Sequence, residues 1–533
     1  MPFDANRRFW GWGVSAYEVP APMRELVRGL LGARFGIAPP EPCPPPTLET
    51  IRMPAPTLSA PATLAELVTN ARYDRAAHTY GKAFRDVVRA LDGDFACAPD
   101  LVAYPRTEDD VVRILRWAGE ARVAVVPFGG GSSVVGGVEA DRETRARFAG
   151  VLSLDLCGLN RVLEIDRDSR CARVQAGTYG PALEAQLKPH GYTLRHFPQS
   201  FEFSTVGGWI ATRAGGHYAT LYTHIDDFVE SVRMVTPRGV LSTRRLPGNG
   251  AGPHEERLVL GSEGALGVIT EAWLRVQDLP RHRAGATVLF ETFAAGASAC
   301  RSLAQSGLFP SNARLIEREE AMFMGAGDGE RHVLVLGFES AKLPQEDKLA
   351  SAIAIAEAEG GVAQRRSVTE STGDDAADRW KAAFLRAPYL RDELARMGMI
   401  SETFETCTTW SGFAALDAAV RAAAEAALRE HCGGGLVTCR FTHLYPDGPA
   451  PYYTIVAPSR AGEQLAHWDA IKQAVSLALV EHGATITHHH AVGKDHRRFY
   501  EMQSAPLTLE MLRAAKRAVD PDGIMNPGTL LRP

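Results

Sequence analysis

Hydrophobic residues recur along this chain with two spacings, and each spacing predicts a different element. Steps of three and four residues are typical of helices, whereas short apolar runs beside turn residues are typical of buried strands. Helical spacing within residues 62–92 is carried by Leu64, Leu67, Ala71, Phe84, Val87, Val88 and Leu91. Further predicted helices are Asp109–Arg122, Pro181–Lys188, Ala414–Arg429 and Asp469–Glu481. The predicted strands are Val123–Val126, Val151–Leu154, Arg161–Ile165, Ala172–Ala176 and Ala484–Thr487.

The two ends of the chain depart from this pattern. Residues 1–60 are rich in proline and are predicted to be irregular, with a loop or extended arm at residues 38–46. The tail that follows residue 487 is predicted to be rich in turns. Residues 281–480 alternate strands with alanine-rich helices, and no internal repeat or long low-complexity linker interrupts the chain. We therefore predict an α+β fold.

Composition narrows the class of protein. At about 150 residues per domain, 533 residues predict about three domains or lobes. The 45% of hydrophobic and 23% of charged residues exclude a disordered or fibrous chain. With a net charge of −5, the chain has no excess of basic residues of the kind that binds nucleic acid or anchors a protein to an anionic membrane. We expect no nucleic-acid partner.

The cysteines and the amino terminus indicate a compartment. None of the eight cysteines forms a CxxC pair, which is typical of reduced thiols in a cytosolic protein. The first residues lack the apolar core and cleavage site of a secretory signal. The longest apolar runs are far below the ~18 residues that a membrane-spanning helix needs. We expect a cytoplasmic protein, and peripheral contact with a membrane stays open.

A run of three glycines, Gly129-Gly130-Gly131, directly follows a predicted strand. Successive glycine N–H groups can surround a diphosphate, and the hydroxyls of Ser132 and Ser133 can add donors. The pattern is neither the GxGxxG of dinucleotide-binding folds nor a P-loop. A tight surface loop is the alternative for this motif alone.

Two more segments combine glycines with hydroxyl residues. They are residues 198–216, which contain Ser204-Thr205-Val206-Gly207-Gly208, and residues 261–270, which begin Gly261-Ser262-Glu263-Gly264. Either segment alone is more often a structural turn. The order and spacing of all three motifs resemble the FAD-binding domain of the vanillyl-alcohol-oxidase-type flavoproteins.

That resemblance implies FAD held between two α+β subdomains, with a separate α+β cap domain over the flavin and a carboxyl-terminal segment that returns to the FAD domain. The implied boundaries are residues 1–94 for an arm with a helical segment, 95–280 for the FAD-binding domain, 281–483 for the cap and 484–533 for the final segment. The cofactor-binding residues implied are Pro127, Phe128, Gly129, Gly130, Gly131, Ser132, Ser133, Gln199, Ser200, Phe201, Glu202, Phe203, Ser204, Thr205, Thr212, Arg213, Ala214, Gly215, Glu263, Gly264, Ala265, Leu266, Gly267, Val268 and Ile269.

One branch of this superfamily, the alkyldihydroxyacetonephosphate synthases, resembles the chain over almost its whole length. The marks are Trp10-Gly11-Trp12-Gly13, residues 402–406 with Trp410, Thr438-Cys439-Arg440 and the triple histidine His488-His489-His490. The branch exchanges the acyl chain of acyl-dihydroxyacetone phosphate for a fatty alcohol, so both lipids are the implied partners. Its implied catalytic residues are Tyr452, His196, His488, His489 and His490, and its implied substrate-binding residues are Arg314, Arg391 and Arg440.

The chemistry of the histidine and tyrosine side chains limits the roles that they can take. Three histidines on a strand would alternate faces, so that His488 and His490 point away from His489. A metal site there lacks a Cys or carboxylate at ligand spacing, so we predict a proton-handling surface and no metal, with a structural cluster as the other alternative. A phenol with a pKa near 10 is a poor base, so Tyr452 as a base requires nearby cations that lower its pKa.

Competing functions remain. The D-lactate and 2-hydroxyglutarate dehydrogenases of the same superfamily bind a metal through two sequence motifs. Of the first motif, this chain keeps only His443 and Asp447-Gly448. In the second motif, it has His489 where those enzymes have a glutamate. An FAD-linked oxidoreductase of a hydroxy acid or another hydroxy compound is the alternative function. A flavin-binding protein without turnover is a third. The sequence also leaves a homodimer open.

Overall fold

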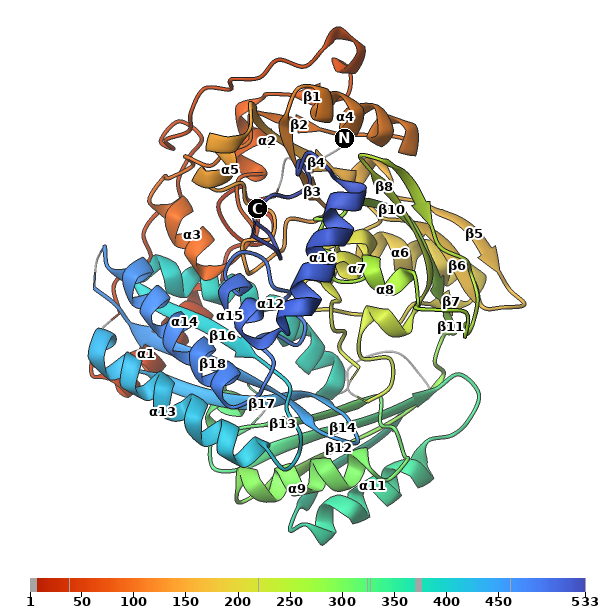
Figure 1. Ribbon diagram of the computed structural model, residues 1–533. Coiled ribbons are helices and arrows are strands. Elements are labelled where there is room, and N and C mark those ends of the chain that lie inside the picture. The colour runs from red at the N-terminus through yellow and green to blue at the C-terminus, as the bar shows by residue number, and fades with distance from the viewer. Residues whose placement is uncertain are drawn as a thin grey trace.

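A computed structural model describes residues 7–37, 39–218, 220–323, 325, 327–369, 376–460 and 462–532, with the side chains of 365–369 and 376–385 excepted. Its elements form three main sheets covered by helices (Figure 1). The mixture of helices with parallel and antiparallel strands confirms the α+β class.

The first two sheets build the amino-terminal half. One sheet has the order β1 (Val68–Thr69), β2 (Leu101–Ala103), β4 (Gly150–Asp155) and β3 (Val123–Phe128). In it β2, β4 and β3 run parallel. The second sheet is antiparallel, with the order β5 (Val162–Asp166), β6 (Cys171–Gln175), β10 (Val268–Arg275), β8 (Val229–Thr236) and β9 (Gly239–Ser242).

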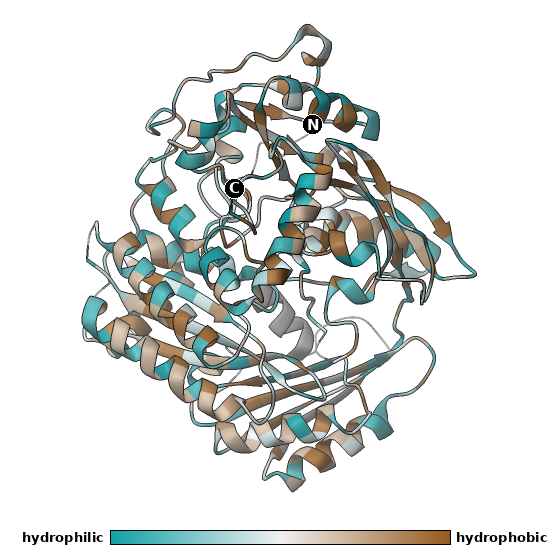
Figure 2. Cartoon of the chain, in the orientation of Figure 1, coloured by the Kyte–Doolittle hydropathy of each residue, from teal (hydrophilic) through white to brown (hydrophobic). Residues whose placement is uncertain are grey.

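A single buried core joins these two sheets. It includes Ile114 from α4 (Glu108–Glu120), Leu152 from β4, Val174 from β6 and Trp209 from α7 (Val206–Thr212). Figure 2 shows that the five-stranded sheet is mostly hydrophobic. Because one core spans both sheets, the loops between them are held on a rigid base.

The third sheet is antiparallel and has seven strands. Its order is β15 (Val362–Thr369), β12 (His282–Phe290), β14 (His332–Ser340), β13 (Asn312–Ile316), β17 (Leu436–Leu444), β18 (Pro449–Pro458) and β16 (Met399–Glu405). One face of it is covered by α9 (Phe293–Ala304), α11 (Glu346–Ala358), α13 (Phe413–Cys432) and α14 (Gln464–Glu481), as Figure 1 shows. The other face is turned towards α7 and the first two sheets.

Most elements predicted from apolar spacing are confirmed, with shifted ends. They are the helices α4, α6 (Gly180–Leu187), α13 and α14, and the strands β3, β4, β5 and β6. The helical spacing over residues 62–92 falls into three short helices, η1 (Ala62–Leu64), α2 (Arg72–Ala77) and α3 (Phe84–Leu91).

Three predictions about the chain ends are wrong. The proline-rich start contains a helix, α1 (Ala21–Phe35), which begins after Pro20 and ends at Gly36 in the left-handed conformation. Proline near a helix start and glycine after its end are the usual stop signals, so the flanking prolines bound this helix. The tail contains α15 (Arg497–Gln503) and α16 (Pro506–Val519). Residues 484–487 form no strand.

The carboxyl-terminal segment returns to the amino-terminal half, as predicted. The N–H of Val125 in β3 donates to Ile524 at 2.8 Å, and the N–H of Asn526 donates back to Val125 at 2.8 Å. The Asn526 amide also donates to the carbonyls of Gly137 and Glu263. No helix in the described part of the chain has the length and apolar character needed to cross a bilayer.

Candidate active site

A cavity of about 850 Å³ lies where the loops of the first two sheets meet the inner face of the third. All three glycine and hydroxyl motifs contribute to its wall. Among the predicted cofactor residues, those that line it are Pro127, Phe128, Gly129, Gly130, Gly131, Ser132, Ser133, Gln199, Ser200, Ser204, Thr205, Thr212, Ala214, Gly215, Glu263, Gly264, Gly267 and Ile269.

The other predicted cofactor residues lie behind this wall or beside it. Arg213 and Leu266 line a second cavity, and Phe201, Glu202, Phe203, Ala265 and Val268 are absent from the lining of both. A direct contact of these side chains with a cofactor stays a prediction.

The cavity wall suits an anionic cofactor. Between residues 127 and 216, the described lining residues carry backbone amides and hydroxyls such as those of Ser132, Ser200 and Thr212, and no carboxylate. An FAD diphosphate needs this chemistry, because hydroxyls and amide N–H groups are its donors. The residues present therefore fit FAD.

The glycine loop is held by packing against the second motif. A Cβ atom on Gly130 would lie 1.8 Å from the carbonyl oxygen of Phe203 and 2.7 Å from the Cα of Ser204. Arg7 contacts both the glycine loop and the second motif. Its guanidinium donates to the Gly130 carbonyl at 2.5 Å and lies 5.3 Å from the Phe203 ring centre. Glycine is required here for loop packing, and no local pattern in the sequence marks Arg7 as its partner.

All three predicted substrate-binding arginines line the cavity. Arg314 is 1% exposed, and its Nη2 donates to the carbonyl of His217 at 2.9 Å. Burial, together with the nearby charge of Arg440, lowers the pKa of Arg314 to about 9. Arg440 is already paired with Glu320, so Arg314 is the guanidinium of this pair that favours a bound anion such as a phosphate.

Arg391 is positioned by the amino-terminal arm. Its Nη2 donates to Asp392 at 2.8 Å, and its Nη1 donates to the Lys82 carbonyl at 2.6 Å. The N–H of Trp12 donates to the other oxygen of Asp392 at 2.5 Å. The tryptophan and glycine motif near the start therefore buttresses the arginine through Asp392, a residue that the sequence analysis missed.

Tyr452 lies on β18 beside the cations, but its pKa moves in the direction opposite to the one that a base requires. Burial raises the pKa of Tyr452, and the Arg440 guanidinium, 3.8 Å from its ring centre, offsets only part of that rise. The condition set for Tyr452 as a base, a lowered pKa, is therefore not met. Arg440 is less effective because it is already paired with Glu320. Tyr452 is a neutral phenol that can first donate a proton.

The triple histidine forms a loop around a buried carboxylate. The N–H groups of His489 and His490 donate to Glu405 at 3.0 and 2.9 Å, and that of His488 donates to it as well. Burial raises the pKa of Glu405 to about 7. Because the N–H groups turn inward to one carboxylate, the segment cannot form a strand, and the predicted alternation of the rings is wrong.

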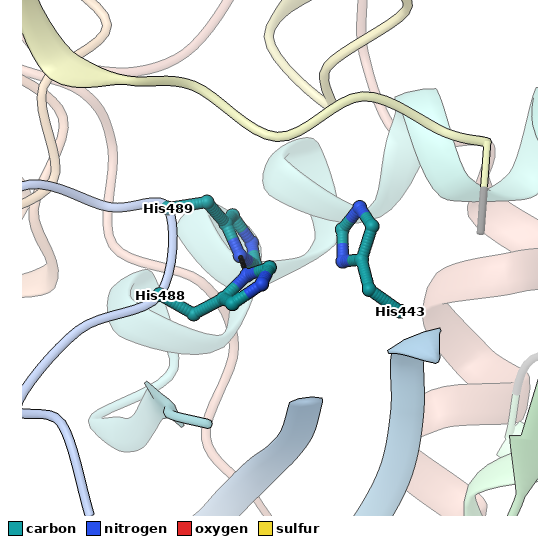
Figure 3. A group of neighbouring side chains, drawn as sticks. All are labelled: His443, His488 and His489. Carbon is teal, nitrogen blue, oxygen red and sulfur yellow. Dashed lines mark hydrogen bonds between the residues drawn. The ribbon is translucent and has the colours of Figure 1, made fainter. Parts of the chain in front are cut away.

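The rings of His488 and His489 instead meet each other. Their Nδ1 atoms are 2.9 Å apart, and His443 from β17 faces them (Figure 3). Burial lowers the pKa of all three rings well below its ordinary value. His490 lies with its ring edge-on to Tyr452, and burial lowers its pKa to about 3. The cluster is therefore neutral at pH 7, and its unprotonated ring nitrogens can accept hydrogen bonds.

His443, His488 and His489 are also the described group with the spacing of a metal site, with nitrogens within 4.8 Å of one another. Two imidazole nitrogens on one tetrahedral zinc would be ~3.3 Å apart, given Zn–N bonds of about 2.0–2.1 Å. The 2.9 Å separation of the two Nδ1 atoms fits a shared proton better. The absence of a metal stays a prediction.

We expect turnover to be unaffected by a chelator. Dialysis against EDTA, followed by elemental analysis and assay, should give full activity with less than stoichiometric metal. Activity that is lost with the chelator and restored by zinc would contradict this, and so would one tightly held metal ion per chain.

His196 lies one layer behind the cavity. Its ring packs edge-on against Trp209 and Phe228, and neither ring nitrogen has a hydrogen-bond partner among the described residues. Burial lowers the pKa of His196 to about 3. A direct catalytic contact stays a prediction, and the packing of the ring points to a structural contribution.

His196→Phe should make the protein more resistant to acid. Below pH 6.5 the unfolded chain protonates His196 and the folded chain does not, so wild-type stability falls as the pH drops. The loss is about 1.4 kcal/mol per pH unit for one such group. Urea unfolding at pH 7.5 and 5.5 should show the variant losing about 1.4 kcal/mol less than wild type. An equal loss in both proteins would refute the burial of a neutral ring.

Several contributors to the site were missed by the sequence analysis. Glu405 was noted only as part of a motif, and its role depends on a loop 83 residues away. Arg386 lines the cavity but has no local pattern that marks it. Met23, Leu26, Val27, Leu30 and Leu31 of α1 also line the cavity. Their spacing is helical, but the prolines around them led to the prediction of an irregular segment.

Comparison with known proteins agrees with this geometry. Residues 99–244 match an FAD binding domain, and residues 279–530 match the C-terminal domain of FAD linked oxidases. FAD is therefore the cofactor. The boundaries at residues 94, 280 and 483 stay predictions.

The chain is 30% identical to alkyldihydroxyacetonephosphate synthase from Dictyostelium discoideum, over 86% of this chain and 77% of that protein. It is 28% identical to the synthase from Trypanosoma brucei brucei, with the same coverage. A solved alkyldihydroxyacetonephosphate synthase superposes with a TM-score of 0.81 at 25% identity, over 98% of both chains. On this similarity of sequence and structure, the chain belongs to the alkyldihydroxyacetonephosphate synthase family of FAD-binding flavoproteins.

Proposed function

We propose that this protein is an FAD-dependent enzyme of ether-lipid synthesis, which exchanges the acyl chain of acyl-dihydroxyacetone phosphate for a fatty alcohol. One observation carries the proposal. A single cavity is lined by the FAD motifs, by arginines and by the apolar face of α1. A phosphate-bearing lipid needs both a cationic and an apolar surface.

Each side of the cavity has a separate task. Arg314 and Arg391 hold the phosphate and the carbonyl region, because a guanidinium matches both in geometry and charge. The apolar residues that α1 contributes, Met23, Leu26, Val27, Leu30, Leu31 and Phe35, provide a surface for an alkyl chain. FAD, when bound, supplies the electrophilic ring system on which the exchange depends.

Tyr452 and the histidines handle protons. Tyr452 protonates the substrate at the reacting carbon as the neutral phenol and takes a proton back as the phenolate, which Arg440 against its ring stabilises. His489, stacked 6.0 Å from the Tyr452 ring centre, is a neutral acceptor beside it. The site therefore pairs a proton donor with a proton acceptor.

The test is incorporation of labelled hexadecanol. Purified protein given acyl-dihydroxyacetone phosphate and the labelled alcohol should form a labelled alkyl product and release fatty acid. If no product forms and a 2-hydroxy acid instead bleaches the flavin, the oxidoreductase alternative replaces this proposal.

Arg391→Lys should raise the KM for acyl-dihydroxyacetone phosphate about tenfold or more, because one buried charge-assisted hydrogen bond is worth about 1.5–3 kcal/mol. A lysine keeps the charge but cannot contact Asp392, Lys82 and the phosphate at once. Arg396→Lys is the matched control, since Arg396 pairs with Glu393 outside the cavity lining. Equal KM values for both variants would remove Arg391 from the phosphate site.

We also propose that lipid substrates arrive from a membrane surface in peripheral contact with α1. Met23 and Leu26 line the cavity yet are 48% and 57% exposed, and Arg24 and Arg28 lie on the same helix. Flotation with anionic vesicles, reduced in Leu26→Asp, tests this contact. A cytoplasmic location and a homodimer stay predictions.

A further inference from the structure

A second cavity of about 1170 Å³ lies on the far side of the histidine cluster. It is lined by His224, His488 and Tyr445. Its wall also includes Leu221 and Leu258, which are 47% and 54% exposed, so it opens to solvent. His489 lines the active-site cavity and His488 lines the second cavity, so these adjacent residues separate the two spaces.

An unbroken row of rings crosses this partition. The Nδ1 of His489 is 2.9 Å from the Nδ1 of His488. The Nε2 of His488 is 3.1 Å from the Nε2 of His224 and 2.7 Å from the hydroxyl of Tyr445. The Nδ1 of His224 lies 3.0 Å from the carbonyl of Arg213. Every step is within hydrogen-bonding distance.

The contacts determine where each proton sits. A carbonyl only accepts, so the Nδ1 of His224 carries a proton and, in the neutral ring, its Nε2 has the lone pair. The Nε2 of His488 must then carry a proton, since two lone pairs would otherwise face each other. His488 therefore accepts at Nδ1, and His489 donates from Nδ1. This order leaves the Nε2 of His489 as an acceptor.

The proposed reaction must export a proton. The fatty alcohol gives up its hydroxyl proton, and the fatty acid leaves as a carboxylate at neutral pH because a carboxyl pKa is about 4. One proton is therefore released per turnover. With substrate and product filling the active-site cavity, that proton needs a path through the protein.

We propose that His489, His488 and His224 form a proton relay that carries this proton from the active-site cavity to the second cavity. The inference rests on the proposed function for the origin of the proton, and on the hydrogen-bonding distances along the row of rings for its path. It assigns His224, which is not among the residues that line the active-site cavity, a task in turnover.

The transfer balances at each ring. A proton binds the Nε2 of His489 while the Nδ1 proton of that ring passes to the Nδ1 of His488. The Nε2 proton of His488 passes to the Nε2 of His224, which releases it to water. Three N–H bonds form and three break, and no electrons move. The charge is held last by His224. Burial lowers the pKa of this ring and the carboxylates of Asp226 and Asp227 offset only part of that fall, so the ring gives the proton up to water.

Nitrogen-15 NMR of histidine-labelled protein tests the row of rings without any turnover. We expect Nδ1–H signals for His224 and His489 and an Nε2–H signal for His488, assigned by their loss in single variants. The reverse tautomer at His488 would overturn the relay whatever the enzyme's activity.

A rescue experiment tests the transfer. His224→Ala should retain FAD and lower alcohol exchange at least tenfold, and imidazole at tens of millimolar should restore most of it. His224→Phe is the matched control, because it removes the same nitrogens and fills the space, so imidazole should not help. Unchanged exchange in both variants, or a loss in His224→Ala that imidazole cannot reverse, would overturn the relay. Absence of exchange in wild type would instead reject the proposed function, and the NMR result would still decide the relay.

Discussion

Tyr452→Phe is expected to lower turnover about 10²–10⁴-fold, the usual contribution of a general acid–base group. The substitution removes one hydroxyl and leaves the ring in place between Arg440 and His489. Packing and FAD content should therefore stay at wild-type values. Steady-state exchange assays, with the flavin spectrum recorded on the same samples, measure both quantities.

Tyr80→Phe is the control for the loss of a buried hydroxyl. Tyr80 is 4% exposed, donates to the Asp94 carbonyl at 2.9 Å and does not line the cavity. Its loss should cost about 1 kcal/mol of stability and leave turnover intact. If Tyr452→Phe matches wild type in turnover, the proton-transfer role passes from Tyr452 to the histidine loop.

Gly130→Ala should weaken FAD binding about tenfold or more. The added Cβ would lie 1.8 Å from the Phe203 carbonyl, and backbone on both sides of the contact leaves no flexible side chain to move away. Overpacking of this kind costs about 1–3 kcal/mol or more, and each 1.4 kcal/mol lowers affinity tenfold. Titration of the apoprotein with FAD, followed by flavin fluorescence, should show a fall of at least tenfold.

Gly119→Ala provides the comparison for that variant. Gly119 lies in α4 with open space around its Cα, so an alanine there should bind FAD like wild type and even favour the helix. Wild-type FAD affinity in Gly130→Ala would mean that the loop can move away from residues 203 and 204 without weakening FAD binding. Loop packing would then not be the reason for a glycine at this position.

The buried core and the cofactor loops could be predicted from local patterns. The apolar run at β3 and the glycines after it are consecutive in sequence, so period and motif together indicate a strand followed by a ligand loop. The residues that line the wall from 127 to 133 agree with that prediction. Arg314, Arg391 and Arg440 were found by resemblance, since an isolated arginine carries no local signal.

The failures have a common physical cause, which is contact between distant segments. The pKa of Tyr452 depends on burial and on the pairing of Arg440 with Glu320, which lies 120 residues from that arginine. The shape of the histidine loop depends on Glu405. Neither effect can be read from spacing along the chain. The first arises between the third sheet and α10 (Arg318–Phe323), and the second where Glu405 of the third sheet meets the histidine loop.

The most direct test of the central claim is the number of turnovers under argon without any electron acceptor. Exchange of acyl for alkyl chain needs no net oxidation, so one enzyme should form many alkyl products, with one fatty acid released per product and the flavin oxidised at the end. Activity that stops after about one turnover, with the flavin reduced and an oxidised substrate formed, would contradict the synthase assignment.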